Sequence, residues 1–367
     1  MLVLHTIVNT FTSKRFIEPL VKVELENGLN SELLIDPING DISFIDLLIV
    51  KHSLAQFDFT VNPIKLIGRI INFFKIIKKR NPDIIICHMT KGAFVPLISS
   101  RLAGVKRRVY YNHGVPYPAY NGILYFSLKL IEFVNCLMAT EIVTVNNVLI
   151  ADLQKLTNKK VTSISPGSVC GISDSFRSLY SSNVKTPREL ELIPELDKKR
   201  ILLYVGRPHL RKGFNLLLDC FKTLEDRDDF LLVIVGCNEQ EVDSYLGCRL
   251  KNVLALGMVL DIKPLYHISD FILLPSYHEG FPMSILEGIS LGCVPIVSDI
   301  KELDLMCQSI TAFRFELNVN NFRSCVINAL TLDERQLISY QEQAHIASAK
   351  FTENTVTNNY FSFLYRK

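Results

Sequence analysis

Short apolar runs that alternate with helical patterns constrain the fold of this chain more than any other feature. In the first half they occupy residues 2–4, 33–35, 46–50, 83–87, 108–111 and 141–145. In the second half they occupy residues 201–206, 230–235, 253–256, 271–274, 294–297 and 312–315. Helical patterns lie between the runs, notably at residues 65–80 and 92–103. This alternation predicts an α/β fold in which parallel sheets are covered by helices on both faces.

The 367 residues are enough for two domains, and a hydrophobic content of 48% can fill two cores. Residues 173–199 lose the strand pattern and gain serine, proline and charge. They predict an inter-domain connection, with a short helix at residues 187–196. We therefore expect an N-terminal domain over residues 1–180 and a C-terminal domain over residues 181–349.

The net charge of +3 conceals an asymmetry between the two halves. Residues 1–183 hold 20 Lys and Arg against 13 Asp and Glu, which gives +7, whereas residues 184–367 hold 20 against 24, which gives −4. A basic first half favours an anionic surface or substrate on that side, although an ordinary solvated surface is the simpler explanation. None of the nine cysteines forms a C-x-x-C pair, so we expect neither a zinc site nor a disulfide framework.

The N-terminus has the pattern of a first strand rather than a signal peptide. The longest stretch without charged residues, 109–128, is interrupted by glycine and proline, so it does not predict a membrane-spanning helix. These features lead us to expect a cytoplasmic protein.

Two glutamates bracket a predicted helix start in the second half of the chain. Residues 275–280 follow an apolar run and carry turn residues, and Pro282 suits the first turn of a helix that Gly292 would end. The N–H groups at such a helix start can bind a phosphate. Glu279 precedes this start and Glu287 lies one turn inside it. Each carboxylate taken alone could simply complement the helix dipole.

A second polar loop follows the first strand of this half and contains Arg207, Arg211 and Lys212 between two glycines. Arg offers a planar fork for phosphate oxygens and Lys a mobile point charge, so Arg207 and Lys212 are suited to bind a diphosphate. Arg211 is expected to be a solvated neighbour. In the first half, His113 follows a strand end and opens a loop, where it could contact a sugar hydroxyl.

The Glu-x7-Glu frame in the sequence E-G-F-P, the spacing of Arg207 and Lys212, and His113-Gly114 together resemble the retaining glycosyltransferases of family 4. The resemblance implies the GT-B fold, with two Rossmann-like parallel-sheet domains facing a cleft. It also implies that a C-terminal helix at residues 350–367 crosses back to the first domain. The first domain would bind the acceptor and the second the nucleotide-sugar. The aromatic stretch after His113 and residues 144–147 are similar to members that extend bacterial surface polysaccharides.

By this resemblance the protein transfers a sugar from a nucleotide-sugar, expected to be a UDP-sugar, to a lipid-linked oligosaccharide of O-antigen, capsule or lipopolysaccharide. We expect contact with the cytoplasmic face of the inner membrane, no nucleic-acid partner and no metal or other cofactor. Glu279 would hold the donor sugar and Glu287 the ribose hydroxyls. The expected catalytic residues are Glu279, His113, Arg207 and Lys212. The expected donor-binding residues are Arg207, Lys212, Gly236, Met258, Gly280, Phe281, Met283, Ser284, Ile285 and Glu287.

Other features leave alternatives open. The basic amphipathic helix expected at residues 65–80 and the aromatic stretch at 117–138 could lie on a membrane or simply pack on the sheet. The loop at residues 9–13 lacks the glycine pair of many relatives, and Cys170 replaces a polar residue in a turn-rich segment. A nucleotide-sugar epimerase or a non-catalytic nucleotide-sugar-binding scaffold remains an alternative function. A dehydrogenase is disfavoured because no G-x-G-x-x-G follows the first strand.

Overall fold

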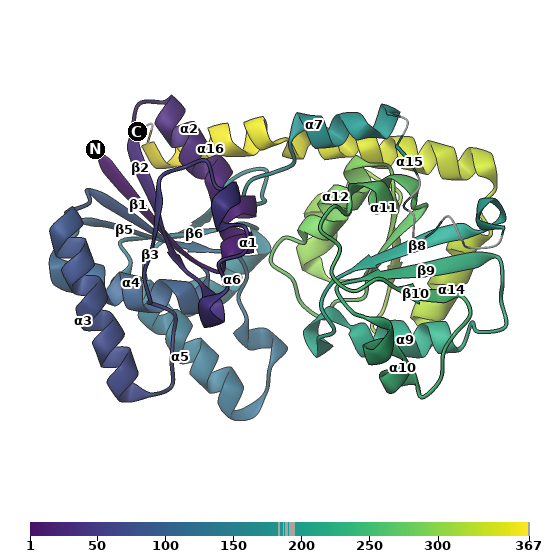
Figure 1. The fold of residues 1–367 in the computed structure, drawn as a ribbon, viewed down its shortest axis with the longest axis horizontal. Coiled ribbons are helices and arrows are strands. Elements are labelled where there is room, and N and C mark those ends of the chain that lie inside the picture. The colour runs from purple at the N-terminus through teal and green to yellow at the C-terminus, as the bar shows by residue number, and fades with distance from the viewer. Residues whose placement is uncertain (183, 186, 188–189, 191–194, 366–367) are drawn as a thin grey trace. The chain divides into compact units, whose positions relative to one another are not determined.

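The computed structural model describes residues 1–182, 184, 185, 187, 190 and 195–365. The chain forms two compact units (Figure 1). Unit 1 comprises Met1–Gly171 with Glu353–Lys367, and unit 2 comprises Ile172–Thr352. The short helix expected at residues 187–196 lies largely outside the described residues. Each unit is a separate α/β layer structure, as the alternating pattern predicts.

Unit 1 is built on a seven-stranded parallel sheet with the order β3-β2-β1-β4-β5-β6-β7. Its strands are β1 (Leu2–Val8), β2 (Asn30–Asp36), β3 (His52–Leu54), β4 (Ile84–His88), β5 (Arg107–Asn112), β6 (Glu141–Thr144) and β7 (Val161–Ser163). The strand predicted at residues 46–50 is wrong, because Ile45–Leu47 forms a 3₁₀ turn and Leu47 and Ile49 are exposed. Strands β3 and β7 have no counterpart among the predicted runs, and each of them is only three residues long.

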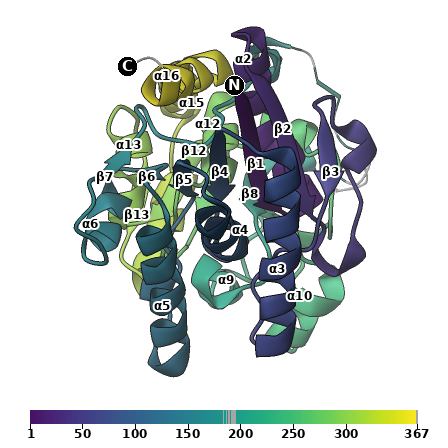
Figure 2. The same ribbon diagram turned by 90° about the vertical axis from the view of Figure 1, so that its left-hand side faces the viewer.

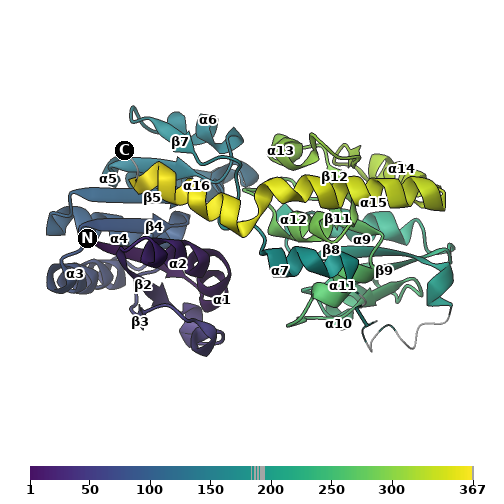
Figure 3. The same cartoon turned by 90° about the horizontal axis from the view of Figure 1, so that it is seen from above.

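The helices of unit 1 are α1 (Thr10–Thr12), α2 (Glu18–Glu26), α3 (Pro63–Arg80), α4 (Thr90–Ala103), α5 (Gly122–Met138), α6 (Val148–Gln154) and α16 (Glu353–Tyr365). Helices α3, α4 and α5 lie side by side on one face of the sheet (Figure 2). Helix α16 lies beside α2 (Figure 3), so the last helix returns to the first unit as predicted.

The expected loop at residues 9–13 is instead the start of a helical segment. The side-chain oxygen of Asn9 accepts hydrogen bonds from the backbone N–H groups of Phe11 (2.8 Å) and Thr12 (3.3 Å). Asparagine caps helices in this way, and the chain then continues through a π-helical turn, Ser13–Ile17, into α2.

Unit 2 contains a six-stranded parallel sheet with the order β10-β9-β8-β11-β12-β13. Its strands are β8 (Arg200–Val205), β9 (Phe230–Val235), β10 (Val253–Ala255), β11 (Phe271–Leu274), β12 (Val294–Ser298) and β13 (Phe313–Phe315), each at a predicted run. Its helices are α7 (Asp174–Arg177), α9 (Phe214–Lys222), α10 (Glu239–Leu246), α11 (Lys263–Ile268), α12 (Met283–Ser290), α13 (Asp304–Cys307), α14 (Val319–Leu330) and α15 (Glu334–Ser348). Helices α9, α10 and α14 cover one face, and α11, α12 and α15 the other (Figure 1).

The division between the units falls after Gly171, earlier than the expected boundary at residues 180/181. Helix α7 packs on unit 2, which explains this position. The guanidinium of Arg177 donates to the hydroxyl of Ser348 (3.0 Å) and to the carbonyl of His345 (3.2 Å). The ring of Phe176 also meets that of Tyr266, with centroids 6.3 Å apart.

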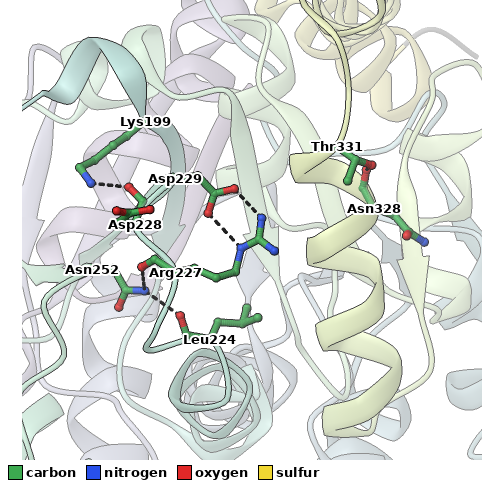
Figure 4. A network of polar contacts seen from close by, with 8 residues as sticks. All are labelled: Lys199, Leu224, Arg227, Asp228, Asp229, Asn252, Asn328 and Thr331. Carbon is green, nitrogen blue, oxygen red and sulfur yellow. Dashed lines mark hydrogen bonds and ion pairs between the residues drawn. The ribbon is translucent and has the colours of Figure 1, made fainter.

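A polar network joins the segments that lead into β8, β9 and β10 (Figure 4). The buried amide of Asn252 donates to the carbonyls of Leu224 (3.0 Å) and Arg227 (3.2 Å). Arg227 pairs with Asp229 just before β9, and Lys199 donates to the carbonyl of Asp228 just before β8. These bonds hold the amino-terminal edge of the sheet, so the opposite edge is the one that can present loops to a ligand.

Candidate active site

The two loops that carry most of the predicted site residues lie at one edge of the unit 2 sheet. Strands β8 and β11 are parallel neighbours, so the loops that follow them emerge side by side. The N–H of Tyr277 in the second loop donates to the carbonyl of Arg211 in the first (2.9 Å). Gly213 has φ +65°, and a Cβ there would lie 1.8 Å from the carbonyl oxygen of Pro275. Only glycine therefore permits this close approach.

Lys212 and Glu279 form an ion pair across these loops. The Nζ atom of Lys212 lies 2.7 Å from Oε1 of Glu279, and the Glu279 side chain is only 5% exposed. Burial alone would raise the pKa of Glu279, but the charge and hydrogen bond of Lys212 outweigh it, and the pKa is lowered. Glu279 is thus an ionised carboxylate at neutral pH, held at a fixed position by the ammonium group.

Cationic side chains gather around the first loop. Arg207 is exposed, and no ion pair involves it among the described residues. The pKa of His209 is lowered by partial burial and by the nearby charges of Arg211, Arg207 and Lys212. Because all three cations lower the pKa of the same histidine, their charges lie close together. This loop is therefore an electropositive site suited to an anionic ligand.

Helix α12 begins beside these loops. Pro282 is its N-cap residue and not a residue of its first turn, because Pro282 has an extended ψ of 103°. Oε2 of the buried Glu287 accepts a hydrogen bond from the hydroxyl of Tyr266 (2.7 Å). The N–H of Ile285 donates to the carbonyl of Pro282 (3.2 Å), so this expected phosphate donor already has a partner within the helix. The close packing of α12 on β11 requires Gly288, whose Cβ would meet Ile272 at 2.9 Å.

The remaining residues of the expected donor-binding set differ in exposure. Met283 and Ser284 are half-buried at the start of α12 and Gly280 is buried just before it. The side chains of Phe281 and Ile285 are buried, and the Phe281 ring packs on Phe351 with centroids 5.4 Å apart. Their side chains therefore serve packing, and only their backbone groups remain as candidates for ligand contacts.

Gly236 and Met258 follow β9 and β10 at the same edge. Gly236 has φ +97°, its N–H donates to the carbonyl of Gly257 (2.7 Å), and a Cβ there would lie 2.6 Å from the carbonyl oxygen of Gly206. Gly236 is thus placed directly against the cation loop. Met258 is 80% exposed, so its side chain is available to a ligand at this edge.

His113 lies in unit 1, after β5, and is half-buried. Its Nε2 lies 2.9 Å from Nδ1 of His88, whose Nε2 lies 3.0 Å from Nδ1 of His5. Burial lowers the pKa of His113 to about 3, so the ring is neutral at physiological pH. The N–H of Gly114 donates to the side chain of Asn112 (2.9 Å), which fixes the turn that follows β5.

The sequence reasoning missed His5, His88 and their partner Glu24. His5 and His88 come directly after the predicted apolar runs at residues 2–4 and 83–87, at positions that would be read as buried strand. Each of the strands β1 and β4 carries one histidine, which could have drawn attention to the pair. The two histidines are neighbours only because β1 pairs with β4, and this strand order could not be predicted from the sequence.

Within the described ranges, no group of three or more His, Cys, Asp or Glu side chains could hold a metal ion. None of the described helices has both the length and the apolar character needed to cross a bilayer.

Two family models match the chain, one on each side of the inter-domain connection. Residues 9–146 match the model described as glycosyl transferase 4-like, and residues 188–305 match the model for glycosyl transferases group 1. The chain belongs to glycosyltransferase family 4. This family of retaining enzymes transfers sugars from nucleotide-sugars.

Two curated relatives of this glycosyltransferase are named for diphosphoundecaprenol-linked sugars. An N,N'-diacetylbacillosaminyl-diphospho-undecaprenol α-1,3-N-acetylgalactosaminyltransferase from Campylobacter jejuni is 27% identical over 45% of this chain and 44% of its own length. A UDP-Gal:α-D-GlcNAc-diphosphoundecaprenol α-1,3-galactosyltransferase from Escherichia coli is 27% identical over 74% of this chain and 71% of its own length. The first match therefore spans less than half of the relative, whereas the second spans most of it.

Among solved structures, Anabaena HepE in complex with UDP and glucose aligns with a TM-score of 0.78. The alignment covers all of both chains at 16% sequence identity. This likeness shows that the glycosyltransferase has the GT-B type of fold, with a parallel sheet in each unit.

Proposed function

We propose that this glycosyltransferase moves a sugar from a UDP-sugar to a lipid-linked oligosaccharide during synthesis of a bacterial surface polysaccharide such as O-antigen, capsule or lipopolysaccharide. The observation that carries the proposal is the ion pair of Lys212 with the buried Glu279, in the same loop region as the exposed Arg207, at the ligand edge of the unit 2 sheet. The two undecaprenol-linked relatives support the choice of acceptor class, and the UDP bound by HepE supports the choice of donor.

In this proposal unit 2 binds the donor. Arg207 and Lys212 hold the diphosphate, together with N–H groups at the start of α12 (Gly280 to Ser284). Glu287 accepts hydrogen bonds from the ribose hydroxyls, and Gly236 and Met258 line the base. When the bond to the sugar breaks, negative charge grows on the diphosphate, and the two cations stabilise it electrostatically without a metal. Glu279, held by Lys212, contacts the sugar.

Unit 1 binds the acceptor near His113, and two of its helices suit contact with a membrane. Helix α5 exposes a stripe of large apolar side chains at helical spacing: Ile123, Phe126, Leu130, Phe133 and Leu137. Ile123 is 87% and Phe126 68% exposed, although the other face of α5 packs into the unit. Because exposed stripes of this kind are rare on monomers, we assign α5 to the acyl chains of a lipid surface.

Helix α3 adds positive charge to the same surface. Ile64, Ile67 and Ile71 are exposed along one stripe, and the exposed Lys75 and Lys78 continue it. Helices α3 and α5 flank α4 (Figure 2). The stripe with its lysines complements anionic headgroups of the cytoplasmic leaflet, where a lipid-linked acceptor would be presented. The apolar stripes and the basic charge of this half of the chain thus have one explanation.

Radiolabelled UDP-sugars incubated with the protein and with lipid-linked acceptors from bacterial membranes would test the proposal. We expect label in the lipid fraction, with the anomeric configuration of the donor retained. The variant Lys222→Ala is the matched control, because the one hydrogen bond of this exposed α9 lysine to the described residues goes to the carbonyl of Leu246 (3.1 Å). Transfer only to soluble small molecules, or equal transfer by the Lys212→Ala variant and the control, would contradict the proposal.

A further inference from the structure

A tyrosine and a glutamate meet between two neighbouring helices of unit 2. The hydroxyl of Tyr266, on α11, donates to Oε2 of Glu287, on α12, at 2.7 Å. Both residues are buried, since Tyr266 is withdrawn from solvent and Glu287 is 6% exposed. Burying a carboxyl group costs free energy unless it is hydrogen-bonded, so the tyrosine hydroxyl helps to explain why a glutamate is tolerated here.

The fold places this hydrogen bond near the ligand edge of the sheet. Helix α11 follows β10 and helix α12 follows β11, so both helices start at the carboxyl ends of parallel strands. The two helices contact each other on one face of the sheet (Figure 1). Tyr266 is the fourth residue of α11 and Glu287 the fifth of α12. The bond therefore lies about one helical turn behind the edge at which the loops of Lys212 and Glu279 emerge.

Several contacts hold Tyr266 in place. The thiol of Cys293 and the N–H of Ser269 donate to its backbone carbonyl, at 3.1 and 3.3 Å. The ring of Phe176 meets the Tyr266 ring edge-on, with centroids 6.3 Å apart and an angle of 67° between the planes. Because both the backbone and the ring are held, the hydroxyl points in one direction. Tyr266 is therefore a rigid donor to Glu287.

A rigid donor is useful to a carboxylate that binds ligand hydroxyls. A glutamate side chain has three rotatable bonds, and fixing them at the moment of binding lowers the affinity. A donor that already holds one carboxylate oxygen removes part of this cost before the ligand arrives. The bond does not exhaust the acceptor, because a carboxylate has about four lone-pair sites. The geometry thus suits a preorganised acceptor of hydrogen bonds.

We propose that Tyr266 is a positioning residue that holds the Glu287 carboxylate ready for the ribose hydroxyls of the nucleotide. This inference rests on the proposed function, in which Glu287 accepts hydrogen bonds from those hydroxyls. Tyr266 and Glu287 both belong to unit 2, which binds the donor in that proposal. Tyr266 acts through Glu287 and does not touch the ligand. It sets how strongly the protein prefers a ribonucleotide to a nucleotide without ribose hydroxyls.

The affinities of the full-length protein for UDP and for 2′,3′-dideoxy-UDP, measured by isothermal titration calorimetry, test this role. The two ligands share the base and the diphosphate and differ only in the ribose hydroxyls. We expect the native protein to bind UDP about 10- to 100-fold more tightly, because the dideoxy ligand offers no hydroxyl to Glu287.

The variant Tyr266→Phe removes the hydroxyl and keeps the ring that packs on Phe176. We expect it to weaken UDP binding roughly 3- to 10-fold and to leave the affinity for the dideoxy ligand unchanged. A general loosening of unit 2 would weaken both ligands equally, so the ratio of the two affinities separates positioning from packing. In turnover, the KM for the UDP-sugar should rise with little change in kcat, as expected when ground-state and transition-state binding are lost together.

The matched control is Tyr245→Phe. Tyr245, on α10, also directs its hydroxyl toward a carboxylate, with the two oxygens of Asp219 at 3.4 and 3.5 Å. Helix α10 covers the opposite face of the sheet from α11 and α12 (Figure 1). This variant therefore loses the same kind of hydrogen bond away from Glu287. It should keep the native affinity for both ligands.

A second variant tests whether Tyr266 acts through the carboxylate alone. In a Glu287→Ala background, Tyr266→Phe should cause no further loss of UDP affinity. A further loss in that background would overturn the inference. An equal loss of both ligands in Tyr266→Phe, or a preference for UDP as strong as in the native protein, would also overturn it.

Failure of the proposed function has a different signature. A native protein that binds UDP and the dideoxy ligand equally, or that binds no UDP, contradicts the proposed donor site, and the role of Tyr266 falls with it. That failure is visible in the native protein, whereas failure of the inference alone is visible only in the variants. The two failures are therefore distinguishable.

Discussion

The ammonium of Lys212 lies 2.7 Å from the carboxylate of Glu279, although 67 residues separate them in the chain. The pair joins the loop after β8 to the loop after β11, and the Glu279 side chain is 5% exposed whereas that of Lys212 is 25% exposed. A nucleotide diphosphate that binds at this edge would meet an ammonium whose position is already fixed. The ammonium in turn keeps the Glu279 carboxylate ionised and fixes its position beside a ligand bound by Lys212.

Loss of Lys212 should affect both catalysis and stability. In Lys212→Ala the buried Glu279 carboxylate has no cation, so we expect about 3 kcal/mol of destabilisation in urea unfolding. Transfer should fall by roughly 100- to 1000-fold, since one stabilising charge of the leaving group is gone.

The double variant Lys212→Ala/Glu279→Ala separates these effects. It should recover much of the lost stability, because no unpaired charge stays buried, but it should not recover activity. If the double variant has the same free energy of unfolding as Lys212→Ala, the stability lost in Lys212→Ala does not come from the unpaired charge of Glu279.

UDP should stabilise the protein through Arg207. At a UDP concentration 100 times its Kd we expect about 2.7 kcal/mol of added stability, measured as a rise in Tm. Arg207→Ala should weaken this rise without changing the Tm of the free protein, because Arg207 is exposed and has no ion pair in the described ranges. A lower Tm of free Arg207→Ala would assign the residue a structural role instead.

Glu132 should make stability depend on pH. This carboxyl of α5 is fully buried, and burial raises its pKa to about 7 despite hydrogen bonds from Thr90, Tyr110 and Asn112. Because the pKa of Glu132 is higher in the folded protein than its usual value of 4.5, Glu132 contributes fully to the free energy of unfolding below pH 4.5. This contribution is lost as the pH rises toward 7. The loss is about 3 kcal/mol.

The variant Glu132→Gln cannot ionise and should remove this loss. Unfolding free energies of both proteins, measured in urea between about pH 4.5 and pH 8, should therefore diverge as pH rises, with the variant gaining relative to the native protein. Parallel curves would show that Glu132 keeps one charge state throughout.

The exposed stripe of α5 should govern binding to vesicles. Phe126→Asp places a charge where the stripe would enter the lipid, so sedimentation with anionic vesicles should fall several-fold while the Tm is unchanged. The control is Ile346→Asp, since Ile346 on α15 is 69% exposed but belongs to unit 2. Equal sedimentation of the two variants would contradict a membrane role for α5.

Asn252 offers a purely structural test. Its amide donates to two backbone carbonyls (Figure 4). These bonds lie at the amino-terminal edge of the unit 2 sheet, whereas the loops of Lys212 and Glu279 follow the carboxyl ends of β8 and β11. Asn252→Ala should cost about 1–3 kcal/mol in urea unfolding. Its transfer rate should be unchanged at temperatures where the variant stays folded.

The sequence was most informative where local patterns determine structure. The runs at residues 230–235 and 271–274 are strands at those bounds, because a continuous apolar run buried on both faces has few other options. Arg207, Lys212 and Glu279 could be selected because each follows a predicted strand, where parallel sheets place their ligand edge. The ion pair itself could not be predicted, since it depends on β8 and β11 being neighbours.

The errors came from features that only tertiary packing determines. The apolar run after Asp46 is partly exposed at Leu47 and Ile49, and it did not become a strand. Asn9 turned an expected loop into a helix by accepting two backbone hydrogen bonds. Glu24 was overlooked because an isolated glutamate in an amphipathic segment looks solvent-exposed, whereas in the fold it contacts His5 on β1 and Tyr360 on α16.

The return of α16 to unit 1 also bears on how the protein is made. A ribosome delivers the chain from its N-terminus, so the whole of unit 2 emerges before the residues that complete unit 1. Until Tyr360 and Tyr365 arrive, the carboxylate of Glu24 lacks two of its donors and α2 lacks its neighbour. The half of the molecule that is synthesised first is therefore the last to be finished.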